Sequence, residues 1–156
     1  MPVVKLSCVI DVPADALWTE LRRPEELGSG LPEVGGARLL GADGNERRTE
    51  WSLLLRGSPL RWIQKELADP GDQKVRVELL AGDLKHLSGY WQVAETDGGS
   101  RTDLELEMDF GFARVAAVLD PLLKEAVTAV ARGVLARAAR CASGRAHLSS
   151  QPEPAP

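Results

Sequence analysis

The stretch Leu60-Arg61-Trp62-Ile63-Gln64-Lys65-Glu66 decides the predicted fold. Successive side chains of a strand alternate between the two faces of a sheet, so the even residues from Leu60 to Glu66 share one face. The charged odd residues Arg61 and Lys65 belong in water, which turns the even residues inward. Large rings beside a few polar groups on an inner face predict the wall of a cavity for an apolar ligand with polar handles.

Strands on either side of this stretch extend the same wall. Downstream, Leu87, Gly89, Trp91 and Val93 share a face, and Leu104, Leu106, Met108 and Phe110 alternate with acidic residues. Such alternation is typical of an antiparallel sheet that is covered on one side. Upstream, Trp51 is predicted to face inward with Leu53 and Leu55, although Leu54 weakens the pattern there.

Composition places the chain among ordinary soluble proteins. It has 156 residues, 44% hydrophobic and 27% charged, which suits one domain with a sizeable core. The net charge of −4 provides no basic stripe for nucleic acid. We expect no membrane insertion, no signal sequence and a cytoplasmic location. Cys8 and Cys141 lie far apart without neighbouring histidines, so neither a metal site nor a disulfide framework is expected.

Turn and cap residues divide the rest of the chain. We predict a strand over 3–11, a helix that starts at Val12-Pro13-Ala14-Asp15 with Pro13 near its first turn, and a short helical turn within 25–31. Antiparallel strands follow over 37–112, separated by turns such as Ala42-Asp43-Gly44-Asn45 and Asp97-Gly98-Gly99. Asp120-Pro121 then predicts the start of a helix that ends near Cys141, with an apolar stripe from Leu122 to Ala138. We predict one domain over 1–142 and a disordered tail over 143–156.

Several short patterns, in this order, carry a resemblance to a known family. They are Val9-Ile10-Asp11-Val12-Pro13-Ala14 before Leu17-Trp18, the segment from Pro24-Glu25 to Leu31-Pro32-Glu33-Val34, Trp62, Gly89-Tyr90-Trp91, Gly98-Gly99 with Thr102, and the closing helix. The chain resembles the START-like (SRPBCC) superfamily, and within it the polyketide cyclase/dehydrase branch, over residues 3–141. The resemblance implies an α+β helix-grip fold, in which a curved antiparallel sheet wraps around a long C-terminal helix and encloses a hydrophobic cavity, with two short helices after the first strand.

The resemblance also implies candidate activities. Members similar to aromatase/cyclases fold a poly-β-keto chain and promote aldol ring closure and dehydration, whereas others bind lipids, quinones or plant hormones without a reaction. In aromatase/cyclases an arginine typically occupies the position that corresponds to Glu66. That departure weakens the case for aromatisation and favours another kind of cyclisation, including a pericyclic one. Fold alone does not decide between catalysis and binding.

Glu66 and Gln64 are the predicted catalytic residues. A carboxyl on a face of Trp and Leu has its pKa raised by desolvation unless a cation meets it, and near neutrality it can act as general acid or base. The alternative places Glu66 at the rim of the sheet, solvated or paired with an arginine. Gln64 is expected to orient a ligand oxygen or, alternatively, to hydrogen-bond the closing helix.

The predicted substrate-binding residues are Leu31, Trp51, Leu60, Trp62, Leu87, Trp91, Leu106, Met108 and Leu122, with the tryptophans alternatively serving only as core. His86 falls on the outer face. No Gly-x-Ser-x-Gly pattern, phosphate loop or metal-ligand spacing occurs, so we expect no cofactor and no metal.

The sequence thus predicts a cofactor-independent cyclase of secondary metabolism that acts on a hydrophobic, polyketide-like substrate. The alternative is a non-catalytic carrier or self-resistance protein for a lipid, quinone or antibiotic. A RatA-like role as a partner of ribosomes or respiratory chains is a third option. The expected partners are a hydrophobic small molecule and, through exposed edge strands, at most a second copy of the chain.

Overall fold

The computed structural model describes residues 3–111 and 113–150. Its strands are β1 (Val3–Ile10), β2 (Val34–Asp43), β3 (Glu46–Leu55), β4 (Ser58–Asp69), β5 (Lys74–Gly82), β6 (His86–Thr96) and β7 (Gly99–Asp109), and its helices are α1 (Ala14–Leu21), α2 (Pro24–Gly28) and α3 (Ala113–Ser150). The strands form a single antiparallel sheet in the order β1-β7-β6-β5-β4-β3-β2. Strands β2 to β7 thus form a meander. Strand β2 is one edge of the sheet, and β1, which pairs with β7, is the other edge.

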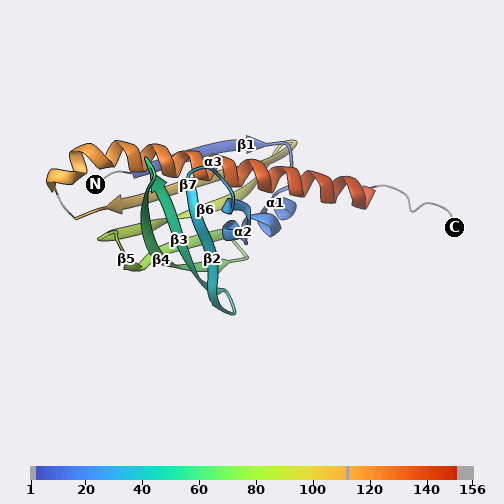
Figure 1. Cartoon of the computed structure of the whole chain (residues 1–156). Coiled ribbons are helices and arrows are strands. Elements are labelled where there is room, and N and C mark those ends of the chain that lie inside the picture. Colours follow the sequence, from blue (N-terminus) through green and yellow to red (C-terminus); the bar gives the residue numbers. More distant parts are fainter. Residues whose placement is uncertain (1–2, 112, 151–156) are drawn as a thin grey trace.

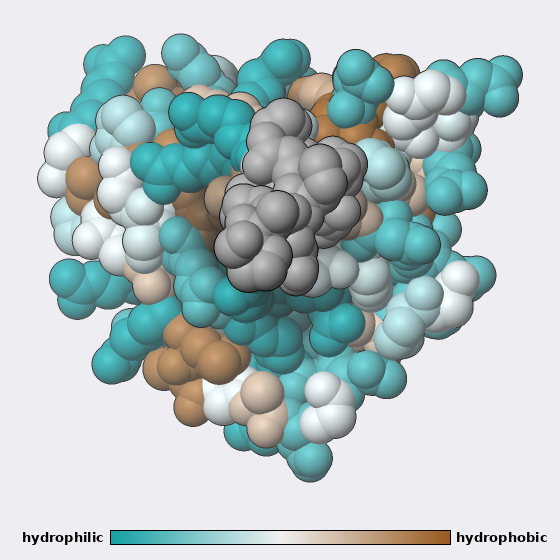
Figure 2. All heavy atoms as spheres, turned by 90° about the vertical axis from the view of Figure 1, so that its right-hand side faces the viewer, coloured by the Kyte–Doolittle hydropathy of each residue, from teal (hydrophilic) through white to brown (hydrophobic). Residues whose placement is uncertain are grey.

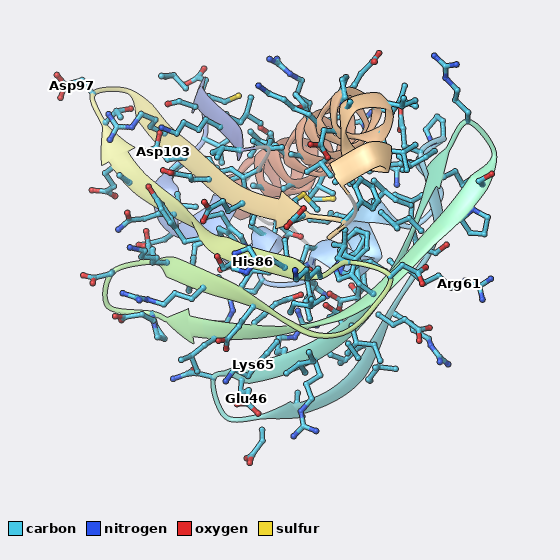
Figure 3. The ribbon with its side chains drawn as sticks, turned by 90° about the vertical axis from the view of Figure 1, so that its left-hand side faces the viewer. Glu46, Arg61, Lys65, His86, Asp97 and Asp103 are labelled. Carbon is cyan, nitrogen blue, oxygen red and sulfur yellow. The ribbon has the colours of Figure 1, made fainter. Side chains whose placement is uncertain are left out.

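The sheet curves around α3, as the helix-grip prediction requires. Figure 1 shows α3 lying along one face of the sheet, with α1 and α2 beside it. Seen from the left-hand end of that view, the strands form a curved wall and α3 crosses its open side, while Arg61 and Lys65 of β4 lie on the outer side (Figure 3). Figure 2 shows the opposite end, where hydrophilic residues predominate around the grey atoms and hydrophobic ones occur in separate patches.

The alternation predicted for β4 is confirmed. Leu60, Trp62, Gln64, Glu66 and Ala68 are buried, and the intervening residues are exposed or half-buried. The inward face of β3 is equally clear, since Thr49, Trp51 and Leu53 are buried and Leu54 is only half-buried. Period-two patterning identified the inner face of both strands because only one side of this sheet is covered.

Helix α3 is longer than predicted at both ends. It begins at Ala113 rather than at Asp120-Pro121, so Pro121 lies inside the helix. It also continues to Ser150 rather than ending near Cys141, while residues 151–156 lie outside the described residues. Once a helix has formed, each further residue adds one hydrogen bond. At the N-terminal side, three of the seven residues 113–119 are alanine, which has the highest helix propensity. The boundary between domain and tail stays a prediction.

The apolar stripe of α3 packs into the curved sheet as expected. Its buried members are Leu123, Ala126, Val127, Val130, Val134, Leu135, Ala138 and Ala142. Arg137 anchors the C-terminal end of α2 to α3, because its Nη1 donates to the carbonyl oxygens of Leu27 (2.8 Å) and Ser29 (2.7 Å). Among the described residues, no helix combines the length and apolar character that crossing a membrane requires.

Candidate functional site

A largely apolar cavity lies between the inner face of the sheet and α3. The cavity has a volume of about 140 Å³. Its lining comes from β1, β3 to β7, α1, Pro24 and α3, namely Leu6, Leu21, Pro24, Trp51, Leu53, Trp62, Gln64, Glu66, Val77, Leu87, Trp91, Thr102, Leu104, Leu106, Met108, Val127, Val130, Ala131, Val134 and Leu135. Gln64, Glu66 and Thr102 are its polar members, which fits a pocket that encloses an apolar body and fixes a few oxygens.

The register of β3 and β4 arranges the polar side of this cavity. A two-residue turn at Arg56 and Gly57, both at positive φ (50° and 85°), joins the two strands. Such a turn sets the register of the whole hairpin. Three inward cross-strand pairs follow one another from it: Trp51 opposite Trp62, Thr49 opposite Gln64, and Arg47 opposite Glu66.

Those pairs form a chain of hydrogen bonds that ends on Glu66. Trp62 Nε1 donates to Gln64 Oε1 (2.9 Å), and Gln64 Nε2 donates to Glu66 Oε2 (2.9 Å). In parallel, Trp51 Nε1 donates to Thr49 Oγ1 (3.1 Å), and Thr49 Oγ1 donates to Glu66 Oε2 (2.6 Å). The indole N–H can only donate, so Trp62 fixes which way the Gln64 amide points. Each tryptophan therefore orients the polar neighbour that holds the carboxyl.

A partly buried arginine lies near the same carboxyl. Arg47 Nη1 lies 3.6 Å from Glu66 Oε1, and it donates to Glu25 Oε2 at 3.1 Å. Arg47 Nη2 also bonds Glu25 Oε1, and Nη1 bonds the carbonyl oxygen of Arg22. Arg47 thus connects β3 and β4 to α2 and the end of α1, with most of its donors turned away from Glu66.

Burial raises the pKa of Glu66 above its ordinary value. Desolvation is the largest cause; the Thr49 and Gln64 hydrogen bonds and the Arg47 charge oppose it, and the Glu25 charge adds to it. Only 4% of Glu66 is exposed. The two alternatives for this residue are therefore combined in the structure, because Glu66 lines the cavity and also lies near an arginine.

Eight of the predicted site residues line this cavity, namely Gln64, Glu66, Trp51, Trp62, Leu87, Trp91, Leu106 and Met108. Three others do not. Leu60 is buried in the core, Leu122 is half-buried on α3, and Leu31 packs against α3 where Gly133 leaves room for it. These three residues do not line the cavity, so the structure does not support their contact with a substrate there. The functional role of all eleven residues stays a prediction.

Gln64 hydrogen-bonds Trp62 and Glu66, which are neighbours on its own strand, rather than the closing helix that one of the two alternatives named. The ring centroid of Trp91 lies 5.4 Å from that of Trp18 on α1, at an interplanar angle of 52°. Trp91 therefore combines core packing with cavity lining. His86 lies half-buried on the outer face as predicted, bonded to Ser88 Oγ (2.9 Å) and 3.9 Å from Glu107 Oε2.

Sequence inspection missed Arg47, Thr49, Glu25 and Thr102. The first two were accessible in principle, because the Arg56-Gly57 turn places them opposite Glu66 and Gln64. Glu25 contacts Arg47 from α2, and no local sequence pattern predicts that contact. Thr102 lines the cavity from β7, and its hydroxyl has no hydrogen-bond partner among the described residues. Within residues 3–111 and 113–150, no cluster of three or more metal-ligating side chains occurs.

Comparison with known proteins identifies the family. The model of the family described as "Polyketide cyclase / dehydrase and lipid transport" matches residues 10–135. The chain belongs to this family. The description of the family names both enzymes and lipid transport. Membership therefore does not decide whether this polyketide cyclase/dehydrase family member is an enzyme or a carrier. No curated protein sequence is a significant match to this chain.

Solved structures show the same fold. The structure of TTHA0849 from Thermus thermophilus has a TM-score of 0.80 at 23% identity, covering 88% of this chain and 97% of that one. The Zhui aromatase/cyclase from a Streptomyces species has a TM-score of 0.76 at 18% identity, covering 97% and 99%. A START superfamily protein from Mycobacterium smegmatis has a TM-score of 0.72 at 13% identity, covering 88% and 97%. These likenesses establish the helix-grip, START-like fold.

Proposed function

We propose that this protein is a cofactor-independent cyclase that folds a hydrophobic, polyketide-like substrate in its cavity and promotes ring closure. One observation carries the proposal. A carboxyl group with a raised pKa lines a largely apolar cavity, Thr49 and Gln64 hydrogen-bond it, and Arg47 lies 3.6 Å from it. The family membership and the aromatase/cyclase among the structural neighbours support a polyketide as the substrate class.

Glu66 supplies the acid–base step. Its Oε2 accepts the hydrogen bonds of Thr49 and Gln64, so Oε1 is the oxygen that exchanges a proton. The carboxylate removes a proton from a carbon that lies between two carbonyl groups, and the resulting enolate carbon forms a bond to a second carbonyl carbon. The new alkoxide then takes the proton back from Glu66. A pKa raised above its ordinary value makes Glu66 a stronger base than an exposed glutamate, and the protonated form can then return the proton.

Gln64 and the tryptophans position the substrate. The Gln64 amide carries two N–H groups, one of which bonds Glu66, and the other is available to a substrate oxygen. Trp51, Trp62 and Trp91 offer flat faces against which a folded chain can stack. Enclosure brings the reacting carbons together and reduces the entropic barrier to ring closure. Shape alone would suffice for a pericyclic closure, in which Glu66 has no proton to move.

The test uses a linear poly-β-keto N-acetylcysteamine thioester as substrate and follows its cyclisation by liquid chromatography and mass spectrometry. We expect the wild type to exceed the spontaneous rate, and Glu66→Gln to reduce the enzymatic rate by about 10²- to 10⁴-fold. Glu26→Gln is the matched control, because Glu26 is exposed on α2 and pairs with Arg23. Full activity of Glu66→Gln would contradict the acid–base role and leave the pericyclic variant. No acceleration by the wild type would contradict the cyclase.

A second candidate function is non-catalytic binding of a lipid, quinone or antibiotic. This function is favoured by the hydrogen bonds of Thr49 and Gln64 to Glu66 Oε2, which satisfy that oxygen without a ligand. Native mass spectrometry after incubation with the same thioester separates the two functions. Retention of the unchanged thioester supports the carrier, and release of a cyclised product supports the enzyme. The proposal also includes a cytoplasmic location and a monomeric or homodimeric state, which cell fractionation and light scattering can check.

A further inference from the structure

Three charged side chains meet at the polar side of the cavity, and their formal charges do not balance. Arg47, Glu25 and Glu66 come from β3, α2 and β4, and their side chains are 11%, 5% and 4% exposed. One guanidinium faces two carboxyl groups. Because burying an unpaired charge is expensive, such a cluster is most stable when one of the two carboxyl groups holds a proton.

The geometry decides which carboxyl pairs with the cation. Arg47 engages Glu25 through both terminal nitrogens, in the bidentate arrangement that makes an arginine–carboxylate pair strong. Its contact to Glu66 is a single approach of 3.6 Å, beyond ordinary hydrogen-bond distance. Arg47 Nη1 also donates to the carbonyl oxygen of Arg22 at the end of α1. This bond holds the guanidinium near the two short helices and away from Glu66. Glu25 therefore holds the cation, and Glu66 is left as the carboxyl that takes up a proton.

We propose that Glu25 is a positioning residue that acts through Arg47 and makes Glu66 the proton-exchanging group of the cavity. Glu25 is absent from the cavity lining, whereas its neighbour Pro24 belongs to it. The relevance of this arrangement to catalysis rests on the proposed cyclase function. The charge arrangement itself is a property of the ligand-free protein and is tested without a substrate.

Among the residues that the structure describes, the other neighbours of Glu66 add no competing charge. On β5 its cross-strand neighbour is Val77, and α3 contributes Val127, Val130, Ala131, Val134 and Leu135 to the lining. Thr49 and Gln64 are neutral donors. On α2, Glu26 pairs with Arg23, which also contacts Glu20. Arg47 and Glu25 are thus the charged groups that set the behaviour of Glu66.

The experiment measures the pKa of Glu66 in the full, ligand-free chain from the pH dependence of its ¹³Cδ chemical shift, assigned by its disappearance in Glu66→Gln. We expect Glu25→Gln to lower this pKa, because it frees Arg47 to close on Glu66 and removes a neighbouring negative charge. Glu26→Gln is the control and is expected to leave the pKa unchanged. An unchanged Glu66 pKa in Glu25→Gln would overturn the proposal.

A double-mutant cycle separates the action through Arg47 from direct repulsion between the carboxylates. If Arg47 transmits the effect, Glu25→Gln lowers the Glu66 pKa by clearly less in an Arg47→Gln background than in the wild type. An equal decrease in both backgrounds would overturn the proposal. If the Arg47→Gln variants do not fold, a crystal structure of Glu25→Gln provides the same decision. Arg47 within about 3.2 Å of Glu66 Oε1 supports transmission, and a separation still near that of the wild type refutes it.

These outcomes remain distinct from the fate of the proposed function. If the protein shows no cyclisation but the Glu66 pKa changes as expected in the variants, the Glu25–Arg47–Glu66 arrangement is supported and only the cyclase function is contradicted. A protein that cyclises substrate through Glu66 but titrates identically in Glu25→Gln and the wild type retains the enzyme and loses this inference.

Discussion

Replacing threonine by valine at two buried positions should have opposite effects on stability. Thr49 is fully buried and Thr102 is 7% exposed, so both hydroxyl groups are removed from bulk water. Thr49 Oγ1 accepts a hydrogen bond from Trp51 and donates one to Glu66, whereas Thr102 Oγ1 has no partner among the described residues. Valine has nearly the same shape as threonine, so the comparison isolates the hydroxyl group.

The magnitudes follow from the partners that each substitution leaves behind. A buried polar group without a partner costs about 1–3 kcal/mol, and a hydrogen bond to a charged group contributes about 1.5–3 kcal/mol. Thr102→Val should therefore raise the free energy of unfolding by about 1–2 kcal/mol. Thr49→Val should lower it by about 2–4 kcal/mol, because it leaves the Trp51 N–H unpaired and removes a donor to Glu66.

The assay is urea unfolding at neutral pH followed by tryptophan fluorescence, with thermal unfolding as a second measurement. In a chain of this length, 1 kcal/mol corresponds to a shift in Tm of about 2–4 °C. The two variants should therefore shift Tm in opposite directions. Destabilisation of Thr102→Val to the extent of Thr49→Val would refute the argument, since the Thr102 hydroxyl would then have a partner such as a buried water. A neutral Thr49→Val would refute the stabilising role of the network.

Two further predictions concern the same wall of the cavity. Because the folded pKa of Glu66 lies above its ordinary value of 4.5, its contribution to stability is present below that value and is lost as the pH rises through the folded pKa. Glu66→Gln should therefore gain stability relative to the wild type as the pH rises from 4.5 to beyond the folded pKa, and a difference that stays constant in urea unfolding over that range would contradict the raised pKa. Gly82→Ala should destabilise the protein by about 3 kcal/mol, because Gly82 has a φ of +124° and a Cβ there would lie 2.5 Å from Arg61 O and Trp62 Cα. Gly41→Ala, with open space around it, is the control for that loss in thermal unfolding, and equal stability of the two variants would show that β5 can move away from β4.

Residues of β4 illustrate why much of the fold could be predicted. A sheet that is covered on one side imposes period-two alternation, and Arg61 and Lys65 mark the outer face of the strand without ambiguity. The same logic identified the inward residues of β3, β6 and β7. Helix ends were less predictable, because Asp120-Pro121 has the chemistry of a helix start while Ala113–Leu119 has the propensity to continue one.

The candidate site divides in the same way. Parity along the strand predicted that Glu66 and Gln64 face the cavity, because that property depends only on neighbours in the chain. The hydrogen bonds to Thr49, and the position of Arg47 across from Glu66, depend on the register that the Arg56-Gly57 turn sets between two strands. A two-residue turn can be recognised in a sequence, so the pairing of Arg47 with Glu66 and of Thr49 with Gln64 was predictable in principle.

The sequence by itself determined the inner face of the sheet, the closing helix and the apolar character of the cavity, since all three follow from local periodicity. Only the tertiary structure decided the charge environment of Glu66. The approach of Glu25 on α2 to Arg47 on β3 depends on how a short helix packs on a curved sheet, which no spacing along the chain encodes. Electrostatic effects of this kind depend on distance and burial in three dimensions, so the chemistry of the wall was decided by packing while its shape was decided by pattern.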